Sequence, residues 1–333
     1  MHAFVTLLLL THFGQEPVES VRIATRPHRI VTDAGAGGYQ AFPDVCRLKN
    51  GDLFCVFYAG YTHISFPTEQ LPRGGRICAI RSSDEGKSWS RPETIIDTPE
   101  DDRDPSVCCL PNGTLLCSFF TYDRSQAVNT CVSRSSDGGR VWSLPEVILP
   151  GYATSTPARR LRSGRLLLPV YYASAGEKRS FAAVCHSDDN GRTWSSPHPI
   201  GLTAGLTLDE TDVYERRDGT ILAVMREVMA SAESRDKGLH WGEVKPLGFP
   251  GHCPYMLMTK AGVLLLAHRL PKTSLHYSLD EGRTWRGPVL IDNTIGAYPS
   301  LVALRSGRIL CVYYEEGPGS GIRAVEIEVS RPK

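Results

Sequence analysis

The chain has 333 residues, and its 37 lysines and arginines against 36 aspartates and glutamates leave a formal net charge of +1. This near-neutral balance excludes bulk electrostatic attraction to nucleic acid as the main role of the protein. Hydrophobic residues make up 41% of the chain and charged residues 22%, which excludes a disordered, fibrous or membrane-spanning class.

Residues 1–20 contain an apolar run that ends with four leucines, Leu7–Leu10. The run is far shorter than a membrane span, so no stable membrane insertion is expected. It also lacks a basic leader and a clear small-residue cleavage site, so a signal segment and a frayed or buried N-terminal extension both remain open. The segment Val21–Thr25 that follows is predicted to be a strand.

Six strand–turn–strand units then follow one another along the chain. In each unit a short strand leads into a turn that ends in glycine, and an apolar second strand follows, which is typical of a β-hairpin. The six units span residues 42–58, 104–120, 156–172, 210–226, 253–269 and 298–314.

A second repeat, out of phase with the first, accounts for all five tryptophans, because each ends the octapeptide Ser-x-Asp-x-Gly-x-x-Trp. The Asp or Ser side chain can bond backbone amides in a tight turn, and the glycine supplies a positive φ. The indole can then anchor the turn to its own sheet. We therefore interpret these carboxylates as structural. The copies span residues 82–89, 135–142, 187–194, 234–241 and 278–285.

Together the two repeats predict the fold. Five hairpins are followed by a tryptophan turn, which would join the third and fourth strands of a four-stranded unit. Six such units predict an all-β, six-bladed β-propeller, a single domain over residues 21–333 with no substantial helix. The last hairpin is followed only by the strand Ile322–Val329, so Val21–Thr25 is expected to supply the outer strand that closes the ring.

In a propeller the first strand of each blade lines the central channel, and its entry residues surround one mouth. The repeat alignment gives six equivalent entry positions: Phe42, Asp104, Thr156, Glu210, Cys253 and Tyr298. The positions before them are Ala41, Arg103, Ser155, Asp209, His252 and Ala297. Purely structural positions should resemble one another around the ring, and these differ, which predicts a ligand site at this mouth.

Two of the second strands end in arginine towards the same mouth, at Arg226 and Arg269. Two such arginines in adjacent blades indicate a fork for a carboxylate or phosphate, although a pair of solvated surface arginines is the structural alternative.

The ten cysteines show no Cys-x-x-Cys spacing, and most lie in apolar runs, so neither a zinc site nor a redox motif is expected. Unpaired cysteines in the core favour a reducing compartment and therefore the cytoplasm. Secretion is the alternative, if the leucine-rich N-terminal run is a signal peptide. No P-loop is present, and nothing indicates a nucleotide, flavin or haem site, so no cofactor or metal is predicted.

The tryptophan octapeptides resemble the Asp boxes of the sialidase (neuraminidase) superfamily, and the repeats that contain them cover nearly the whole chain. Glu210–Arg226 resembles the family's Glu-then-Arg segment, which implies Glu210 as the activating carboxylate and Arg226 as one of three arginines. Ala297–Glu315 resembles the nucleophile segment and implies Tyr298 as nucleophile. Arg269, nine residues ahead of the last Asp box, is similarly placed to another family arginine.

The resemblance implies a retaining exo-sialidase whose partner is a glycan with an acidic terminal sugar. Sialic acid carries a carboxylate on its anomeric carbon, so a neutral tyrosine suits the transition state better than Asp or Glu. A phenol is a weak nucleophile, so Glu210 would take its proton while the arginines hold the substrate carboxylate.

Two family features are missing. The Arg-Ile-Pro motif of the first blade reads Ala41-Phe42-Pro43 here, and the loop 59–75, where the family has its acid/base aspartate, contains no aspartate. We hypothesise that Arg103 serves as the third arginine and Asp104 as the general acid. A salt-bridged strand entrance in residues 101–105 is the structural alternative. Asp44 and His63 are lesser candidates for this region.

Two other functions remain open. The missing arginine admits a propeller glycosidase or lyase acting on another acidic or deoxy sugar. A non-catalytic glycan-binding propeller is the third possibility, although a scaffold would have no need of Glu210, Arg226, Arg269 and Tyr298 together. The oligomeric state does not follow from the sequence.

Overall fold

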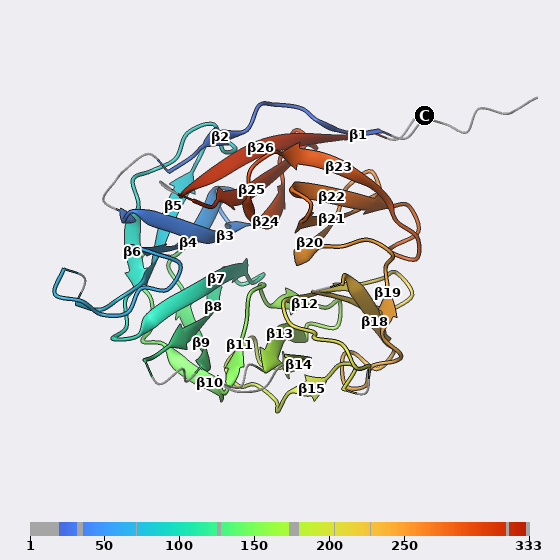
Figure 1. Cartoon of the computed structure of the whole chain (residues 1–333), viewed down its shortest axis with the longest axis horizontal. Coiled ribbons are helices and arrows are strands. Elements are labelled where there is room, and N and C mark those ends of the chain that lie inside the picture. Colours follow the sequence, from blue (N-terminus) through green and yellow to red (C-terminus); the bar gives the residue numbers. More distant parts are fainter. Residues whose placement is uncertain are drawn as a thin grey trace, which may run out of the picture.

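A computed structural model describes residues 20–31, 36–70, 72–124, 128–172, 180–202, 204–226, 228–317 and 320–330. Within these residues the strands form six antiparallel sheets arranged around a common centre (Figure 1). This arrangement confirms the predicted all-β, six-bladed propeller. The predicted N-terminal extension lies outside the described residues, except that Ser20 already belongs to the first strand.

The blades follow one another in chain order, each with its first strand innermost. Blade 1 consists of β3 (Tyr39–Arg47), β4 (Leu53–Gly60), β5 (Arg76–Ser82) and β6 (Glu93–Ile96). Blade 2 consists of β7 (Asp101–Cys109), β8 (Leu115–Tyr122), β9 (Val128–Ser135) and β10 (Glu146–Pro150). Blade 3 consists of β11 (Tyr152–Ala153), β12 (Arg159–Arg160), β13 (Leu166–Tyr172), β14 (Phe181–Ser187) and β15 (His198–Pro199).

The second half repeats the pattern. Blade 4 consists of β16 (Thr211–Glu215), β17 (Ile221–Met225), β18 (Ala230–Ser234) and β19 (Lys245–Pro246). Blade 5 consists of β20 (His252–Met258), β21 (Leu264–Arg269), β22 (Thr273–Ser278) and β23 (Arg286–Asp292). Blade 6 consists of β24 (Gly296–Ala303), β25 (Ile309–Glu315), β26 (Gly321–Ser330), β1 (Ser20–Ile23) and β2 (His28–Arg29).

The ring is closed by strands from both ends of the chain. β1 pairs antiparallel with β26, with Val21 opposite Val329, and β2 pairs with the start of β26. Figure 1 shows the blue β1 running along the red β26 at the outer edge of blade 6. The predicted closure is therefore confirmed, and the sheet of blade 6 joins residues about 300 positions apart in sequence.

Each of the five tryptophan octapeptides forms a turn in which the serine makes the same two hydrogen bonds, whereas the indole bonds the glycine carbonyl only in the first two copies. In the first copy the Ser82 hydroxyl donates to Asp84 at 2.8 Å and accepts the Gly86 N–H at 2.8 Å. The Trp89 indole N–H donates to the Gly86 carbonyl at 3.1 Å. The equivalent serine bridges aspartate and glycine in the other four copies. The structural interpretation of these carboxylates is thus confirmed.

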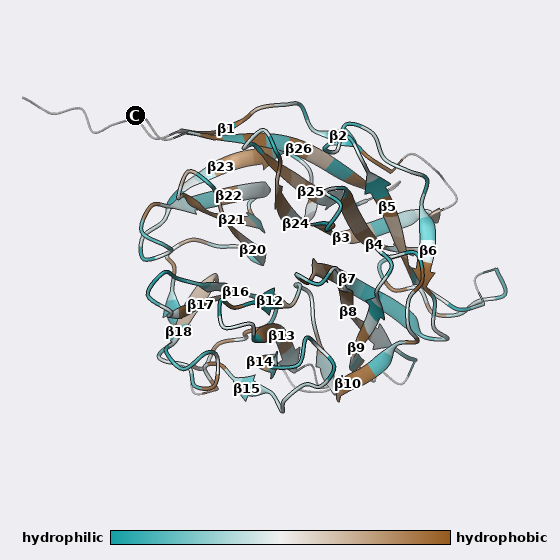
Figure 2. Ribbon diagram, turned by 180° about the vertical axis from the view of Figure 1, so that it is seen from behind, coloured by the Kyte–Doolittle hydropathy of each residue, from teal (hydrophilic) through white to brown (hydrophobic). Residues whose placement is uncertain are grey.

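Apolar side chains from adjacent blades form the core. All eight residues of β4 are buried, and its side chains pack towards blade 6 on one face and towards blade 2 on the other. Figure 2 shows this distribution, with brown inner strands such as β3 and β4 and teal loops at the rim. The ten cysteines are all free thiols, seven of them buried, as expected for core residues.

Two buried aspartates connect neighbouring blades at the channel. Asp44 of β3 accepts the Val107 N–H of β7 at 2.7 Å and the Ser300 hydroxyl of β24 at 2.5 Å. Asp212 of β16 likewise accepts the Met256 N–H of β20 at 2.6 Å. Each aspartate lies two residues after a mouth position, so the same register produces an inter-blade contact in two places.

We predict that Asp44→Asn lowers the free energy of unfolding by about 1–3 kcal/mol, because the amide NH₂ would face donors that now bond a carboxylate. Asp188→Asn is the matched control, since its carboxylate is 60% exposed and pairs with Arg165 on the surface. That change should cost less than about 1 kcal/mol. Urea unfolding at neutral pH measures both, and equal losses would contradict the proposed inter-blade role.

Candidate functional site

Four of the six mouth residues have an unusual backbone conformation. Phe42, Asp104, Cys253 and Tyr298 have φ values of 52°, 46°, 54° and 43°. In all four blades the strand register shifts at this residue, which is the mark of a β-bulge. A positive φ is costly for residues other than glycine, and bulges re-aim side chains next to functional sites. This shared strain therefore singles out the mouth as the candidate site.

The central feature of the mouth is a hydrogen-bonded pair from blades 4 and 6. The Tyr298 hydroxyl of β24 donates to Glu210 Oε1, which lies just before β16. The other oxygen, Glu210 Oε2, accepts the Cys253 N–H at 2.9 Å. Glu210 is buried, so these donors replace the water that its carboxylate loses.

The surroundings push the two ionisable groups of this pair in opposite directions. Burial alone would raise the pKa of Glu210, but the Arg226 guanidinium, the Tyr298 hydroxyl and the Cys253 N–H outweigh it and hold that pKa below its ordinary value. Burial, reinforced by Asp104 and Glu210, raises the pKa of the Tyr298 phenol well above its usual range. At neutral pH the pair is therefore an ionised carboxylate that accepts a hydrogen bond from a protonated phenol.

Two arginines lie beside this pair and remain partly exposed. Arg226 Nη1 donates to Glu210 Oε1 at 2.6 Å, and its Nε lies 3.8 Å from Asp209. Arg269 Nη2 lies 3.2 Å from His252 Nδ1, and its Nη1 lies 3.9 Å from Glu316. The two predicted arginines thus stand in the adjacent blades 4 and 5.

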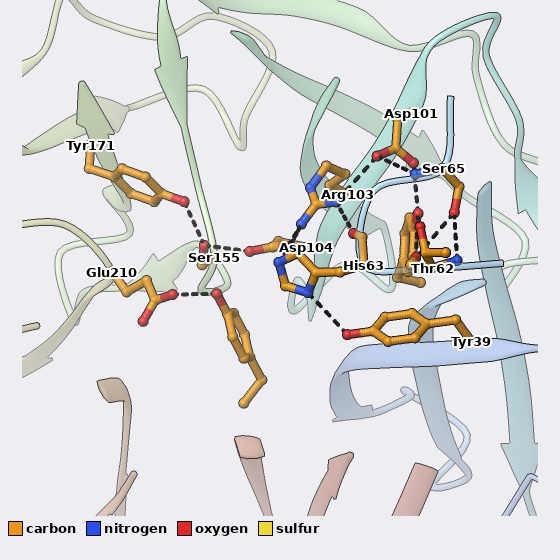
Figure 3. Close-up of polar contacts among 12 residues, drawn as sticks. Tyr39, Thr62, His63, Ser65, Asp101, Arg103, Asp104, Ser155, Tyr171 and Glu210 are labelled. Carbon is orange, nitrogen blue, oxygen red and sulfur yellow. Dashed lines mark hydrogen bonds and ion pairs between the residues drawn. The ribbon is translucent and has the colours of Figure 1, made fainter. Parts of the chain in front are cut away.

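Asp104 faces Glu210 across the mouth (Figure 3). Its Oδ2 accepts the Ser155 hydroxyl at 3.0 Å, and Ser155 also lies 3.4 Å from the Tyr171 hydroxyl. Its Oδ1 is buried and makes no hydrogen bond. Burial raises the pKa of Asp104 to about 6, Arg103 opposes this shift and Glu210 adds to it. Asp104 is therefore a carboxyl group able to hold a proton close to neutral pH.

Arg103 is only 6% exposed, and protein groups surround its guanidinium. Nη1 donates to the His63 carbonyl and to Asp101 Oδ2, and Nη2 lies 4.0 Å from Asp104. The guanidinium also lies 5.4 Å from the Phe42 ring centroid. This enclosure does not favour the predicted direct contact with a substrate carboxylate. The guanidinium instead holds the loop that carries His63 against blade 2.

His63 lies on that loop, between β4 and β5, and its ring is part of the mouth wall (Figure 3). Its Nδ1 is 3.0 Å from the Tyr39 hydroxyl, and its Nε2 is 3.4 Å from Arg103 Nη2. Partial burial and then the Arg103 charge lower the pKa of His63. The imidazole is therefore neutral near pH 7 and has partners at both nitrogens, which makes it a poorer proton donor than Asp104.

The structure brings together Tyr298, Glu210, Arg226, Arg269, Asp104, Arg103 and His63 at one mouth. Asp44 lies two residues further along its strand, and its carboxylate accepts inter-blade hydrogen bonds, which argues against a substrate contact. Tyr39, Tyr171 and Glu316 also belong to the site, and sequence analysis did not select them as candidates. Ser155 and Cys253 are among the aligned mouth positions, so the repeat alignment predicted that they lie at the mouth but did not predict a role for them.

In the part of the chain that the structure describes, no group of three or more His, Cys, Asp or Glu side chains is arranged to hold a metal ion. Among the same residues, no helix is long and apolar enough to cross a membrane.

The propeller, its Asp-box turns and its mouth define the class of this protein as a propeller of the sialidase superfamily. A profile of the BNR repeat-like domain matches residues 74–311. The chain therefore belongs to the BNR repeat-like domain family, and the resemblance seen in the sequence is confirmed.

Sequence relatives agree with this assignment. A sialidase of Micromonospora viridifaciens is 26% identical over an alignment 352 positions long, gaps included, which covers 87% of this chain and 52% of that protein. A sialidase of Bacteroides fragilis is 26% identical over 141 residues, covering 39% of this chain and 24% of that protein. The chain thus spans about half or less of the length of these curated relatives.

Solved structures share the fold. A Dyadobacter fermentans protein of unknown function has a TM-score of 0.80 at 23% identity, covering 93% of this chain and 99% of that one. The Hadza microbial sialidase Hz136 has a TM-score of 0.73 at 18% identity, covering 90% of this chain and 68% of that one. At these identities the likeness establishes the six-bladed architecture alone.

Proposed function

We propose that the protein is a retaining glycoside hydrolase of the exo-sialidase type, which removes a terminal sialic acid or a related acidic sugar from a glycan. The observation that carries the proposal is the hydrogen-bonded series from Tyr298 to Glu210 to Arg226. A propeller that served only as a scaffold would have no reason to bury a carboxylate against a phenol at its mouth.

In the first step the Tyr298 oxygen attacks the anomeric carbon while its proton passes to Glu210 Oε1. The bond to the leaving oxygen breaks, and a general acid protonates that oxygen. A glycosyl–tyrosine intermediate results, and water then attacks it from the side of the departed group and gives its proton to the ionised general acid. Glu210 returns its proton to the phenolate, so the enzyme is restored and the sugar is released with retained configuration.

Arg226 and Arg269 are the groups proposed to hold the sugar carboxylate. Both are partly exposed at the mouth, and their guanidinium groups can each donate two parallel hydrogen bonds to a carboxylate. Arg226 has a second role, because its charge keeps Glu210 ionised and ready to accept the tyrosine proton.

Asp104 is the proposed general acid. It has the raised pKa that an acid needs, an oxygen without a hydrogen-bond partner, and a position close to the Tyr298 and Glu210 pair. Arg103 enters the proposal as a positioning residue, since its enclosed guanidinium fixes the His63 loop and lowers the pKa of Asp104.

A second candidate function has one observation in its favour. Ala41 stands where the family has its first arginine, and the ring of Phe42 beside it packs 4.8 Å from the Tyr298 ring and 5.3 Å from the Tyr314 ring. An aromatic wall at this position suits a less polar part of a sugar than a carboxylate. Hydrolysis of another acidic or deoxy sugar is therefore the alternative, and a panel of aryl glycosides separates the two.

We predict that the protein releases 4-methylumbelliferone from its sialoside, and that Tyr298→Phe lowers turnover by orders of magnitude while the protein still folds, as cooperative thermal unfolding would show. The phenylalanine keeps the ring contacts and removes only the nucleophilic oxygen. Glu210→Gln should behave similarly, because an unassisted phenol remains protonated near neutral pH. Wild-type turnover in Tyr298→Phe would remove this residue from the mechanism.

The arginine fork makes a binding prediction. Arg226→Lys and Arg269→Lys keep the positive charge but lose the bidentate geometry, so each should weaken binding of an unsaturated 2-keto acid analogue. Isothermal titration of the wild type and both variants measures the effect. Equal affinity in all three proteins would show that no carboxylate is held there.

The role of Asp104 makes a prediction about leaving groups and pH. Asp104→Ala should cripple hydrolysis of natural glycosides, whose alcohol leaving groups need a proton, and largely spare aryl glycosides. The acid is protonated below its pKa of about 6, so wild-type kcat/KM on natural glycosides should fall as the pH rises through that value. Equal losses on both substrate classes, or none, would contradict the assignment.

A further inference from the structure

An apolar band is exposed at the outer edge of blade 2, where the Asp-box turn leads into β10. Val141 is 69% exposed, Leu144 87% and Val147 59%. Nine large apolar side chains are exposed among the described residues, and these three fall within seven consecutive positions. We call residues 141–147 the blade 2 band. Exposed apolar groups that gather in one place, unlike singly scattered ones, mark a contact surface.

The other blades provide an internal comparison, because the band contains the end of an Asp box. In the other four copies the residue before the tryptophan is polar, and its side chain lies between 2.6 and 2.7 Å from the second oxygen of the Asp-box aspartate. In blade 2 this residue is Val141, whose side chain has no group that could bond Asp137. An exposed valine thus replaces a hydrogen bond in this blade alone. The polar equivalents are Ser88, Thr193, His240 and Thr284.

The second residue after the tryptophan shows the same difference. In blade 2 it is Leu144, whereas the other copies have Arg91, Ser196, Glu243 and Gly287. The turn itself therefore requires neither Val141 nor Leu144, and neither side chain is buried within its own chain. An apolar side chain that faces water is stabilised when a second surface covers it.

A hollow of about 450 Å³ opens beside the band, between blades 2 and 3. Val141 and Trp142 line it from blade 2, and Arg192 lines it from the Asp box of blade 3. The Trp142 ring is held in place, since it stacks on Phe54 with centroids 6.2 Å apart and its N–H donates to the Gly139 carbonyl at 3.1 Å. A surface that is already ordered loses little conformational entropy when a partner binds.

We propose that the blade 2 band binds a second copy of this chain in a two-fold symmetric dimer. In a two-fold contact each copy supplies both halves of every interaction. Leu144 lies two residues after Trp142 and outside the hollow, so each copy carries an exposed leucine next to a hollow with an apolar wall. Leu144 of each copy fills the hollow of the other.

The charges around the band favour a copy of the same chain as the partner. The Glu146 side chain is 60% exposed, although it also lies 3.1 Å from Arg134 of its own chain. Arg192 at the hollow is exposed as well. A uniformly acidic or uniformly basic partner would meet a like charge on this face. Two-fold pairing instead brings Glu146 of each copy to Arg192 of the other.

Strand β10 is also suited to this partner. It forms the outer edge of blade 2 (Figure 1), and within the described residues only β9 pairs with it. Edge strands are usually protected by charged residues or proline, but Val147, Ile148 and Leu149 in the middle of β10 are all apolar. A two-fold axis across this edge makes the two β10 strands antiparallel, so they can lie side by side.

The dimer leaves both catalytic mouths open. In blade 2, β7 begins at the mouth and runs away from it, β8 returns, and β9 runs away again. The Asp box after β9 therefore lies at the end of the blade opposite the mouth. The proposed dimer does not depend on the proposed hydrolase activity, and either can fail without the other.

Sedimentation velocity of the full chain tests the proposal. The wild type should form a dimer by about 100 μM, because contacts of ordinary size reach micromolar affinity or better. Val141→Thr and Leu144→Ser introduce the residues that blade 3 has at these positions, and each should weaken dimerisation about tenfold or more. Val141→Thr also restores the missing bond to Asp137. At dilutions where the wild type is monomeric, its thermal midpoint should therefore be no lower than that of the wild type.

Leu290→Ser is the matched control, since Leu290 is 48% exposed on the outer strand β23 of blade 5, and the dimer should be unchanged. Arg192→Glu should weaken the dimer, and adding Glu146→Arg should restore it; failure of that rescue overturns the two-fold pairing. A monomeric wild type overturns the proposal, whether or not another protein binds the band. A dimer that keeps wild-type affinity in both Val141→Thr and Leu144→Ser overturns it too.

Discussion

The buried carboxylate of Glu210 is the constraint on which the rest of the site depends. A carboxylate removed from water is costly unless donors replace the lost hydration. Here Arg226 comes from the same blade, the Cys253 N–H from blade 5 and the Tyr298 hydroxyl from blade 6. These donors come from three consecutive blades, so the packing of blades 4, 5 and 6 against one another brings the Tyr298–Glu210 pair together.

The repeats in the sequence were sufficient to predict the fold, because turn chemistry and strand patterning recur in every blade. The alignment of hairpins also predicted which residues share the mouth, since register carries over between blades. One difference appears in blade 3, where Thr156 precedes the short strand β12 (Arg159–Arg160) and lies outside it. The aligned sequence position of Thr156 thus predicted its place in the ring, but it did not predict whether the local backbone forms a strand.

Side-chain roles were less predictable, and Arg103 shows why. Its position beside Asp104 indicated a free arginine at the mouth, yet the His63 carbonyl and Asp101 enclose its guanidinium. The direction of a long side chain depends on loops from a neighbouring blade, and no repeat encodes those loops. Tyr39 and Glu316 were missed for the same reason, since they lie outside the aligned mouth positions. Asp44 was misleading because an inter-blade contact and a ligand contact both require a carboxylate near the channel.

The departures from the family pattern compensate one another physically. Ala41 leaves blade 1 without the family's arginine, the neighbouring Phe42 offers an aromatic surface, and Arg103 brings a charge from blade 2 to lie against that surface. The same guanidinium lowers the pKa of Asp104, whereas burial and Glu210 raise it to about 6. Arg103 and Glu210 come from separate blades and shift the pKa of Asp104 in opposite directions, and the proposed role of this carboxyl group as acid and then as base rests on the balance between them.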